Sequence, residues 1–216
     1  MRKSLLLLAG LGLTLPTLAQ TERGAKLIGV SVGDLRYANY KTRNARELSA
    51  AVYPSLGWFV HDRLALGSGL LLIYEHDKSK SDNVYLGYPT RSSGHVLGIG
   101  VAPFARYYFY DGTPHKIFGQ AGVELASYFS SSTYNDGNRG YTSKDSGTRT
   151  GWYANVGYNY FLSPSVALEA TAGYRRGAFF DYAPQRFGNT FPAENGLDVR
   201  LGFSFFLPAA KVAAVD

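Results

Sequence analysis

The feature that most constrains this chain of 216 residues is a repeated alternation of apolar side chains with small or polar ones. In the clearest segment, 97–109, the odd positions from Leu97 to Phe109 are apolar or aromatic, whereas the even positions hold Gly, Ala, Phe, Arg and Tyr. A period of two places successive side chains on opposite faces of an extended strand. The pattern therefore predicts an all-β protein whose strands have two chemically different faces.

Seven further segments carry the same alternation, less cleanly in the three nearest the N-terminus. They span 26–35, 47–60, 63–74, 117–129, 152–160, 166–175 and 197–207. Short and long connections between the segments alternate strictly. The short ones are turn clusters at 61–62, 111–114 and 163–165. The long ones are polar and lie at 36–46, 75–94, 130–148 and 176–196. This order predicts eight antiparallel strands.

The two faces of the segments differ in a way that favours a membrane barrel. The apolar face is continuous and ends in aromatic residues, namely Trp58, Tyr107, Phe109, Trp152, Tyr160 and Tyr174. Aromatic rings prefer the membrane–water interface. The other face holds mainly small residues and isolated charges, which suit the narrow interior of an eight-stranded barrel. A sheet in a bilayer must close; a soluble secreted barrel is the alternative.

The N-terminal residues have the pattern of a secretory signal peptide. A basic head of two residues precedes an apolar run to Leu15, and small residues lead to a cleavage site after Ala19. The run is short for a membrane anchor, which is the other interpretation. We therefore expect a signal peptide at 1–19, a barrel at 20–207 and a short periplasmic tail at 208–216.

Composition excludes several classes of site. The chain has no Cys, which excludes a disulfide scaffold, a thiolate zinc site and a cysteine nucleophile. The formal net charge of +6 falls to about +4 (6 − 2) when Arg2 and Lys3 leave with the signal peptide. The remaining basic residues form no run, whereas a nucleic-acid interface needs a clustered basic stripe. No nucleic-acid partner is expected.

The secretory leader, the run RLALGSGL at 63–70 and the run VAPFARYYF at 101–109 resemble the bacterial outer-membrane β-barrel domain family. The size is similar to OmpA- and OmpX-type barrels. The resemblance implies an eight-stranded antiparallel transmembrane barrel with short periplasmic turns, long extracellular loops and porin-like relatives. Two departures are expected: Phe206 is followed by a tail rather than ending the chain, and no OmpA-type peptidoglycan-binding domain follows the last strand.

Seven charged residues fall on the face expected to point into the barrel. They are Glu47, Arg106, Glu124, Glu169, Arg175, Asp198 and Arg200. One interpretation is an ion pathway or a proton relay. The other is a network of salt bridges that fills the interior, which eight strands leave just wide enough for side chains. Unpaired buried charges are costly and both signs occur together here, so we favour the structural interpretation.

The sequence assigns no catalytic, cofactor-binding or metal-binding residue. His61 and His115 fall at the expected periplasmic turns, whereas His76 and His95 flank a long connection. A lipid A hydrolase would need a serine and a carboxylate beside one of the latter two. Neither has a serine two residues later, the spacing that resemblance to PagL-like deacylases would require. The segment 136–140 suggests a calcium loop but lacks its ligands, and we interpret it as a loop tip.

The expected partners lie in the membrane and outside it. Four basic residues in the first long connection suit lipopolysaccharide phosphates: Arg36, Lys41, Arg43 and Arg46. Five rings in the last connection suit either a cap on the barrel or a surface partner: Phe179, Phe180, Tyr182, Phe187 and Phe191. We expect a monomeric, non-enzymatic outer-membrane barrel with a role in envelope structure or adhesion. The alternatives are a narrow pore and a lipid A-modifying enzyme.

Overall fold

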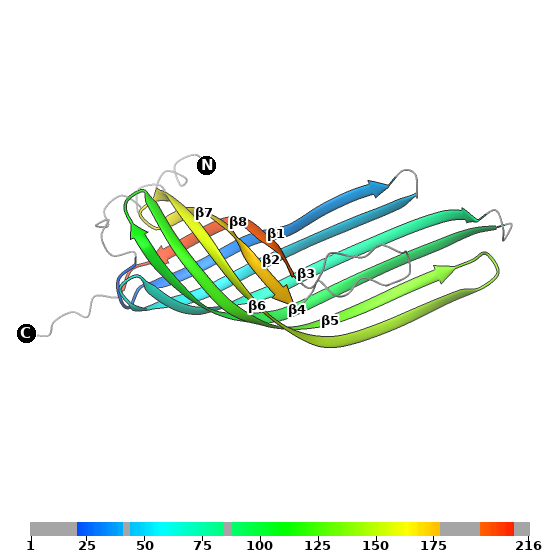
Figure 1. Cartoon of the computed structure of the whole chain (residues 1–216), viewed down its shortest axis with the longest axis horizontal. Helices are drawn as coiled ribbons and strands as arrows, with labels where there is room; N and C mark the ends of the chain where they lie inside the picture. Colours follow the sequence, from blue (N-terminus) through cyan, green and yellow to red (C-terminus); the bar gives the residue numbers. More distant parts are fainter. Residues whose placement is uncertain (1–20, 41–43, 84–87, 178–194, 210–216) are drawn as a thin grey trace, which may run out of the picture.

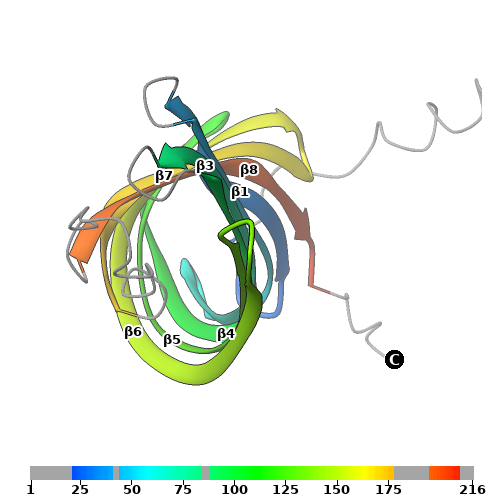
Figure 2. The ribbon, with the colours of Figure 1, turned by 90° about the vertical axis from the view of Figure 1, so that its right-hand side faces the viewer.

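The protein forms a closed barrel of eight antiparallel strands (Figures 1 and 2). The computed structural model describes residues 21–40, 44–83, 88–177 and 195–209. Its strands are β1 (Lys26–Tyr40), β2 (Ala45–His61), β3 (Leu64–Asn83), β4 (Tyr88–Asp111), β5 (His115–Asn135), β6 (Gly140–Ser163), β7 (Val166–Gly177) and β8 (Asn195–Leu207). Each pairs with the next, and β1 pairs with β8. The predicted fold is confirmed.

Some predictions concern residues outside these ranges. The expected signal peptide at 1–19, most of the long connection at 176–196 with its five rings, and the end of the expected tail are not among the described residues. In the ranges that the structure describes, no helix is long and apolar enough to span a membrane.

The alternation of side chains follows the barrel wall as the sequence predicts. From Leu97 to Phe109, every odd residue of β4 is exposed on the outside, while Ala102, Phe104 and Arg106 are buried in the lumen. We call the outward apolar side chains the apolar belt. It comprises Ile28, Val30, Val32, Val52, Leu56, Leu66, Leu70, Leu72, Leu97, Ile99, Val101, Val123, Leu125, Val156, Leu168, Leu197, Val199 and Leu201. Such a belt is typical of a surface that faces lipid.

Aromatic residues border the apolar belt at both ends. Toward the tight turns the exposed rings are Trp58, Tyr107, Phe109 and Tyr160. Toward the opposite end they are Tyr37, Tyr74, Phe129, Trp152 and Tyr174. Rings at the two edges of an apolar band match the two interfaces of a bilayer.

The tight turns gather at one end of the barrel, which we call the short-turn end. The β2–β3 turn is Asp62-Arg63, one residue later than the sequence predicts, because β2 continues to His61. Arg63 has a φ of 67°, a left-handed conformation uncommon for non-glycine residues. Its backbone N–H donates to the carbonyl of Thr21 at 2.7 Å, which fixes the start of the described chain against the turn.

The opposite end differs from the prediction, because three of the long polar connections are mostly strand. β3 continues to Asn83 and β4 begins at Tyr88, while β5 continues to Asn135 and β6 begins at Gly140. Ser, Thr and Tyr dominate 127–135 and 141–150, and Thr and Tyr are strand formers. The polar composition of these segments suggested loops. The strands continue there instead, and polar side chains on both faces fit a sheet that lipid no longer surrounds.

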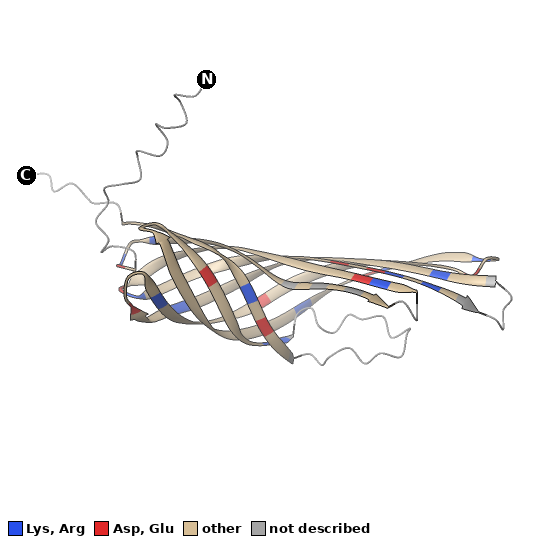
Figure 3. Cartoon of the chain, turned by 90° about the horizontal axis from the view of Figure 1, so that it is seen from above, with Lys and Arg blue, Asp and Glu red and all other residues tan. Residues whose placement is uncertain are grey.

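The strands β1 to β6 therefore extend together beyond the apolar belt (Figures 1 and 3). We call this part the protruding sheet. It comprises 38–40, 45–47, 75–83, 88–96, 130–135 and 140–150. Among the described residues, β6 pairs with β7 only from Gly151 onward, and β1 pairs with β8 only up to Gly33. The protruding sheet thus has two edges that the neighbouring strands β7 and β8 do not cover.

Candidate functional site

The lumen at the short-turn end is filled by five aromatic side chains, which we call the aromatic plug. They are Phe59, Tyr108, Phe118, Phe161 and Phe206. Their ring centroids lie 4.9–6.4 Å apart, within the range of favourable aromatic contacts. Space for these rings comes from small residues on neighbouring strands. A Cβ built at Gly157 would lie 2.0 Å from the Phe118 ring, so a larger residue there would force the ring to move.

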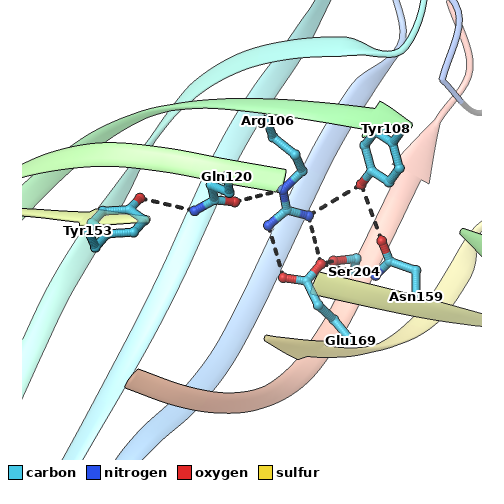
Figure 4. Close-up of polar contacts among 7 residues, drawn as sticks. All are labelled: Arg106, Tyr108, Gln120, Tyr153, Asn159, Glu169 and Ser204. Carbon is cyan, nitrogen blue, oxygen red and sulfur yellow. Dashed lines mark hydrogen bonds and ion pairs between the residues drawn. The ribbon is translucent and has the colours of Figure 1, made fainter. Parts of the chain in front are cut away.

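Arg106 contacts Tyr108 and Phe118 of the plug and reaches Glu169 on β7 (Figure 4). Its Nη1 and Nη2 atoms donate to Oε2 and Oε1 of Glu169 at 2.7 and 2.9 Å. Its Nε donates to Gln120 at 2.7 Å, and its guanidinium carbon lies 3.9 Å from the centre of the Phe118 ring. A bidentate arginine–carboxylate pair is the strongest side-chain ion pair geometry. Because β4 and β7 are not neighbours, this pair ties opposite walls together.

Polar side chains complete the surroundings of this pair. Asn159 Nδ2 donates to Glu169 at 3.0 Å, the Ser204 hydroxyl donates to the same carboxylate, and the Tyr108 hydroxyl donates to Asn159 Oδ1 at 3.3 Å. Gln120 Nε2 donates to the Tyr153 hydroxyl at 3.0 Å. The network draws on β4 to β8 (Figure 4). A buried charge with its hydrogen bonds satisfied rigidifies its surroundings.

A second ionic cluster lies farther from the short-turn end. Arg200 Nη2 lies 2.8 Å from Asp198 Oδ2, and Arg175 Nη2 lies 3.2 Å from Asp198 Oδ1. Glu124 lies between the two guanidinium groups, 3.4 Å from Arg175 Nε and 3.7 Å from Arg200 Nη2. Tyr53 accepts a hydrogen bond from Arg175 at 3.0 Å. Two cations and two anions therefore compensate one another in a buried site.

Between the two clusters lies a polar cavity of about 30 Å³. Side chains of both clusters line it, including Arg106, Glu169 and Arg200, and so do Asn155 and Thr171. The volume suits one or two water molecules. The arrangement can hold the barrel wall rigid, and it offers little space for a solute.

Six of the seven charges predicted to point inward are brought together in these clusters, and Glu47 is not. Glu47 lies on the protruding sheet opposite Asp77, and the Tyr40 hydroxyl donates to it at 3.4 Å. The sequence placed the neutral partners of the clusters on the inward face but gave them no role. Those partners are Tyr108, Gln120, Tyr153, Asn155, Asn159 and Ser204. The one sequence feature that could have identified them is that they fall on the same face of each strand as the charged residues.

The histidines occupy the positions that the sequence predicts. His61 and His115 lie at the short-turn end, and His115 Nδ1 is 2.6 Å from the Tyr158 hydroxyl. His76 and His95 are directly opposite each other on β3 and β4, just beyond the belt. Nδ1 of His76 is buried without a hydrogen-bond partner among the described residues. Glu75 lies on the other face of β3, so the strand does not direct its carboxylate toward His76.

The segment 136–140 is the tip of the β5–β6 hairpin, as the sequence interpretation expected. Oδ1 of Asp136 accepts hydrogen bonds from the backbone N–H groups of Asn138 and Arg139 at 3.0 and 2.6 Å. Gly137 has a φ of 88°, which a residue with a side chain rarely adopts. The Asp136 carboxylate therefore serves the turn. Among the residues described, no group of three His, Asp or Glu could hold a metal ion.

The pKa values of two aspartates outside the belt are shifted in opposite directions. Partial burial alone would raise the pKa of Asp111, but hydrogen bonds from Lys116 and Thr21 and the charges of Lys116 and Arg63 outweigh it, so the pKa lies below its usual value. At Asp77, burial raises the pKa, and the charge of Glu47 adds to the rise despite the opposing effect of His76. Asp111 is held in a favourable ionic site, and Asp77 is not.

The family model for an outer membrane protein beta-barrel domain matches residues 5–205 of this chain. No curated protein sequence matches it. Similar solved structures include a major outer membrane protein from Thermus thermophilus, with a TM-score of 0.48 and 17% identity over 85% of this chain and 99% of that one. The N-terminal β-barrel domain of Pseudomonas aeruginosa OprF has a TM-score of 0.39 and 16% identity over 86% and 98%. Ail, the attachment invasion locus protein of Yersinia pestis, has a TM-score of 0.39 and 10% identity over 86% and 99%.

Proposed function

Because the chain belongs to the outer membrane protein beta-barrel domain family and lies in a bacterial outer membrane, we propose that it is a closed, non-enzymatic anchor whose protruding sheet makes contacts outside the cell. The observation that carries this proposal is the contrast along the barrel axis. The lumen is filled by side chains, while six strands continue beyond the belt, where the described parts of β7 and β8 do not pair with the outer edges.

The filled lumen supports an anchor over a pore. Tyr108 and Phe118 of the aromatic plug are fully buried, and Arg106 spans the lumen above them to reach Glu169. An ion would have to displace plug rings and a bidentate ion pair, and breaking such a pair leaves a buried charge uncompensated. The charged residues therefore support wall-to-wall bracing rather than a selectivity lining.

The edges of the protruding sheet that β7 and β8 do not cover support a contact function. Among the described residues, β5 is the strand that pairs with the β6 residues 140–150. An edge strand presents unpaired N–H and C=O groups to which an extended segment of another protein can add. The segment also carries exposed Tyr141 and Lys144, which would give such a contact side-chain selectivity. We propose an extended segment of a partner protein as the occupant of this edge.

The arrangement of the histidines supports a role without catalysis. A hydrolase site needs a histidine oriented by a carboxylate and within reach of a nucleophile. His76 has an unpartnered Nδ1 among the described residues, and Glu75 occupies the opposite face of its strand. A lipid A-modifying activity would therefore require His76 to be oriented by a group other than its neighbouring carboxylate.

The test is a shortened hairpin. Residues 131–144 are replaced by Asn-Gly, so that a two-residue turn joins the paired residues Ser130 and Asp145. The matched control replaces only the tip, 136–139, by Asn-Gly and keeps the sheet. Cells producing each form are compared for settling by cell–cell contact and for retention on fibronectin, laminin and collagen.

We expect the full chain and the tip variant to increase cell–cell settling or retention relative to cells without the protein, and the shortened hairpin to lose that increase. Folding of every form is checked by the gel shift between boiled and unboiled samples. The proposal is wrong if the full chain gives no increase in any assay, or if the shortened hairpin retains it.

A further inference from the structure

Two histidines lie beside each other on the outward face of the protruding sheet, and we call them the histidine pair. His76 on β3 is directly opposite His95 on β4. Both side chains point outward, because they keep the phase of the exposed residues Tyr74 and Leu97, two positions closer to the belt. Directly opposite residues have their Cβ atoms about 4.5–5.5 Å apart. The two imidazole rings can therefore share one ligand.

The ring nitrogens of the histidine pair are not used by the protein. Neither ring makes a hydrogen bond with another described residue, and Nδ1 of His76 is buried without a partner. The other two histidines differ, because Nδ1 of His61 lies 3.2 Å from the carbonyl of Asp62 and Nδ1 of His115 lies 2.6 Å from the Tyr158 hydroxyl. A buried polar atom without a partner costs free energy. A ligand that engages the rings of the pair would offset that cost.

The surroundings of the pair orient one ring and leave the other open to solvent. The ring of His76 stacks on Tyr74, with centroids 6.5 Å apart and planes 16° apart, while His95 is exposed. The residue opposite His76 on β2 is Leu48, and the residue opposite His95 on β5 is Ser131. Both flanking residues are uncharged, so the imidazole nitrogens are the strongest ligands at this place on the outward face.

The charges near the pair come from both faces of the sheet. On the inner face, which is acidic here, Asp77 follows His76 along β3, and Glu47 lies opposite Asp77. Burial raises the pKa of Asp77 overall, but His76 and His95 each act to lower it, so this carboxylate interacts electrostatically with both rings. On the outward face Lys78 lies two residues beyond His76, about 7 Å along the strand. The acids behind the pair favour a bound cation, and Lys78 opposes it.

We propose that the histidine pair binds a divalent transition metal ion of the zinc or copper class. Imidazole is a preferred ligand of these ions, and a Zn–N bond of about 2.0–2.1 Å places two ligand nitrogens about 3.3 Å apart. Side chains on directly opposite residues can reach that separation. No third His, Asp or Glu joins the pair among the described residues, so water completes the coordination. The ion ties β3 to β4 beside the belt, independently of the partner proposed for the β6 edge.

The experiment measures metal binding by the full chain, without a polyhistidine tag, folded in detergent micelles. Zinc chloride, nickel chloride and magnesium chloride are titrated separately in a calorimeter. The variant is His76→Gln with His95→Gln. The matched control is His61→Gln with His115→Gln, which removes two histidines at the short-turn end. Every form is first checked by the gel shift, and the single variant His95→Gln, at an exposed position, replaces the double variant if that one does not fold.

We expect the wild type and the control to bind one zinc ion per chain, to bind nickel as well, and to ignore magnesium, which requires oxygen ligands. Removing the histidine pair should raise the Kd for zinc at least about tenfold. Lys78→Gln should lower that Kd about threefold at low salt, because it removes a cation near a divalent ion. Zinc should raise the urea midpoint of the wild type and not that of the pair variant, because an ion bound to the folded state stabilises it.

Three results would overturn this proposal. One is an equal loss of zinc affinity in the pair variant and in the control, which would mean that histidines bind zinc wherever they are exposed. Another is magnesium binding as tight as zinc binding, which would assign the ion to the carboxylates of the inner face. The third is the absence of zinc binding by the folded wild type at about 1 mM zinc, the weak end of specific affinities.

Discussion

The lumen and the protruding sheet share most of their strands, yet their charged side chains are paired differently. In the lumen each cation faces an anion from another strand, as Arg106 faces Glu169 and Arg175 faces Asp198. On the protruding sheet Arg46 lies opposite Lys78, and Glu47 lies opposite Asp77. Charge in the lumen is compensated within the chain, whereas the proposed function assigns the sheet to contacts outside the chain.

The largest expected effect comes from removing one partner of the buried ion pair in the lumen. Replacing Glu169 by Leu leaves Arg106 buried without its carboxylate and should lower the free energy of unfolding by about 3–5 kcal/mol. The measurement is urea unfolding from lipid vesicles, followed by tryptophan fluorescence. In the protruding sheet, Lys78→Gln should change the same quantity by no more than about 0.5 kcal/mol.

A double variant separates pairing from packing. Arg106→Leu together with Glu169→Leu removes both charges, and apolar replacement of a buried pair is often close to neutral. We therefore expect the double variant to be more stable than Glu169→Leu alone. If the double variant is the less stable of the two, the two side chains do not act as a pair.

A pair of glycine substitutions gives the next largest effect. Gly157→Ala would place a Cβ 2.0 Å from Phe118 in the aromatic plug, so the rings must shift. Overpacking of this kind typically costs about 1–3 kcal/mol. At Gly140 of the protruding sheet the nearest atom would be 3.7 Å away, an ordinary contact. Equal effects of the two substitutions on the urea midpoint would contradict a tightly filled plug.

The dependence of stability on pH should report on Asp111 at the short-turn end. Its pKa is lowered in the folded protein, so its charged form stabilises the fold above the usual pKa of 3.8. That contribution is lost as the pH falls through 3.8 and then through the lower folded value. The stability difference between the wild type and Asp111→Asn should therefore be large at pH 7 and shrink toward pH 3. A difference that grows toward acid would contradict the ionic site with Lys116.

The smallest effect is expected on the protruding sheet. The raised pKa of Asp77 shows that its charge is unfavourable there, and Glu47 lies directly opposite. Asp77→Asn should therefore stabilise the protein at pH 7, by about 0.2–1 kcal/mol, the usual size of a cross-strand charge effect. Thermal unfolding of the two proteins in the same detergent checks the sign. A clear loss of stability would show that the acidic face is internally compensated.

Much of the fold was accessible from the sequence, because the two-residue period survives in every wall strand. The odd positions from Leu97 to Phe109 and the even positions from Trp152 to Tyr160 all lie outside, as predicted. The protruding sheet was missed because both of its faces carry polar side chains, such as Ser131 and Thr142, where no lipid surrounds it. The sequence there does not alternate between apolar and polar residues, and only the pairing of β5 with β6 reveals the strands.

The candidate site was only partly accessible, for a related reason. Inward position could be predicted for Arg106 and Glu169 from their phase along β4 and β7. The pairing between them could not, because it joins strands that are neither adjacent in the sheet nor close in sequence. For the same reason the sequence could not predict that Phe59, Phe118 and Phe206, which lie on different strands, pack together in one plug.

The central claim is that side chains close the lumen. The most direct test of this claim is ion conductance across a planar lipid bilayer. Insertion is first shown by the gel shift between boiled and unboiled protein. The filled lumen predicts no steady current steps from inserted wild-type protein. Repeatable steps whose size changes in Glu124→Gln would contradict the account, because they would make the second ionic cluster the lining of an open path.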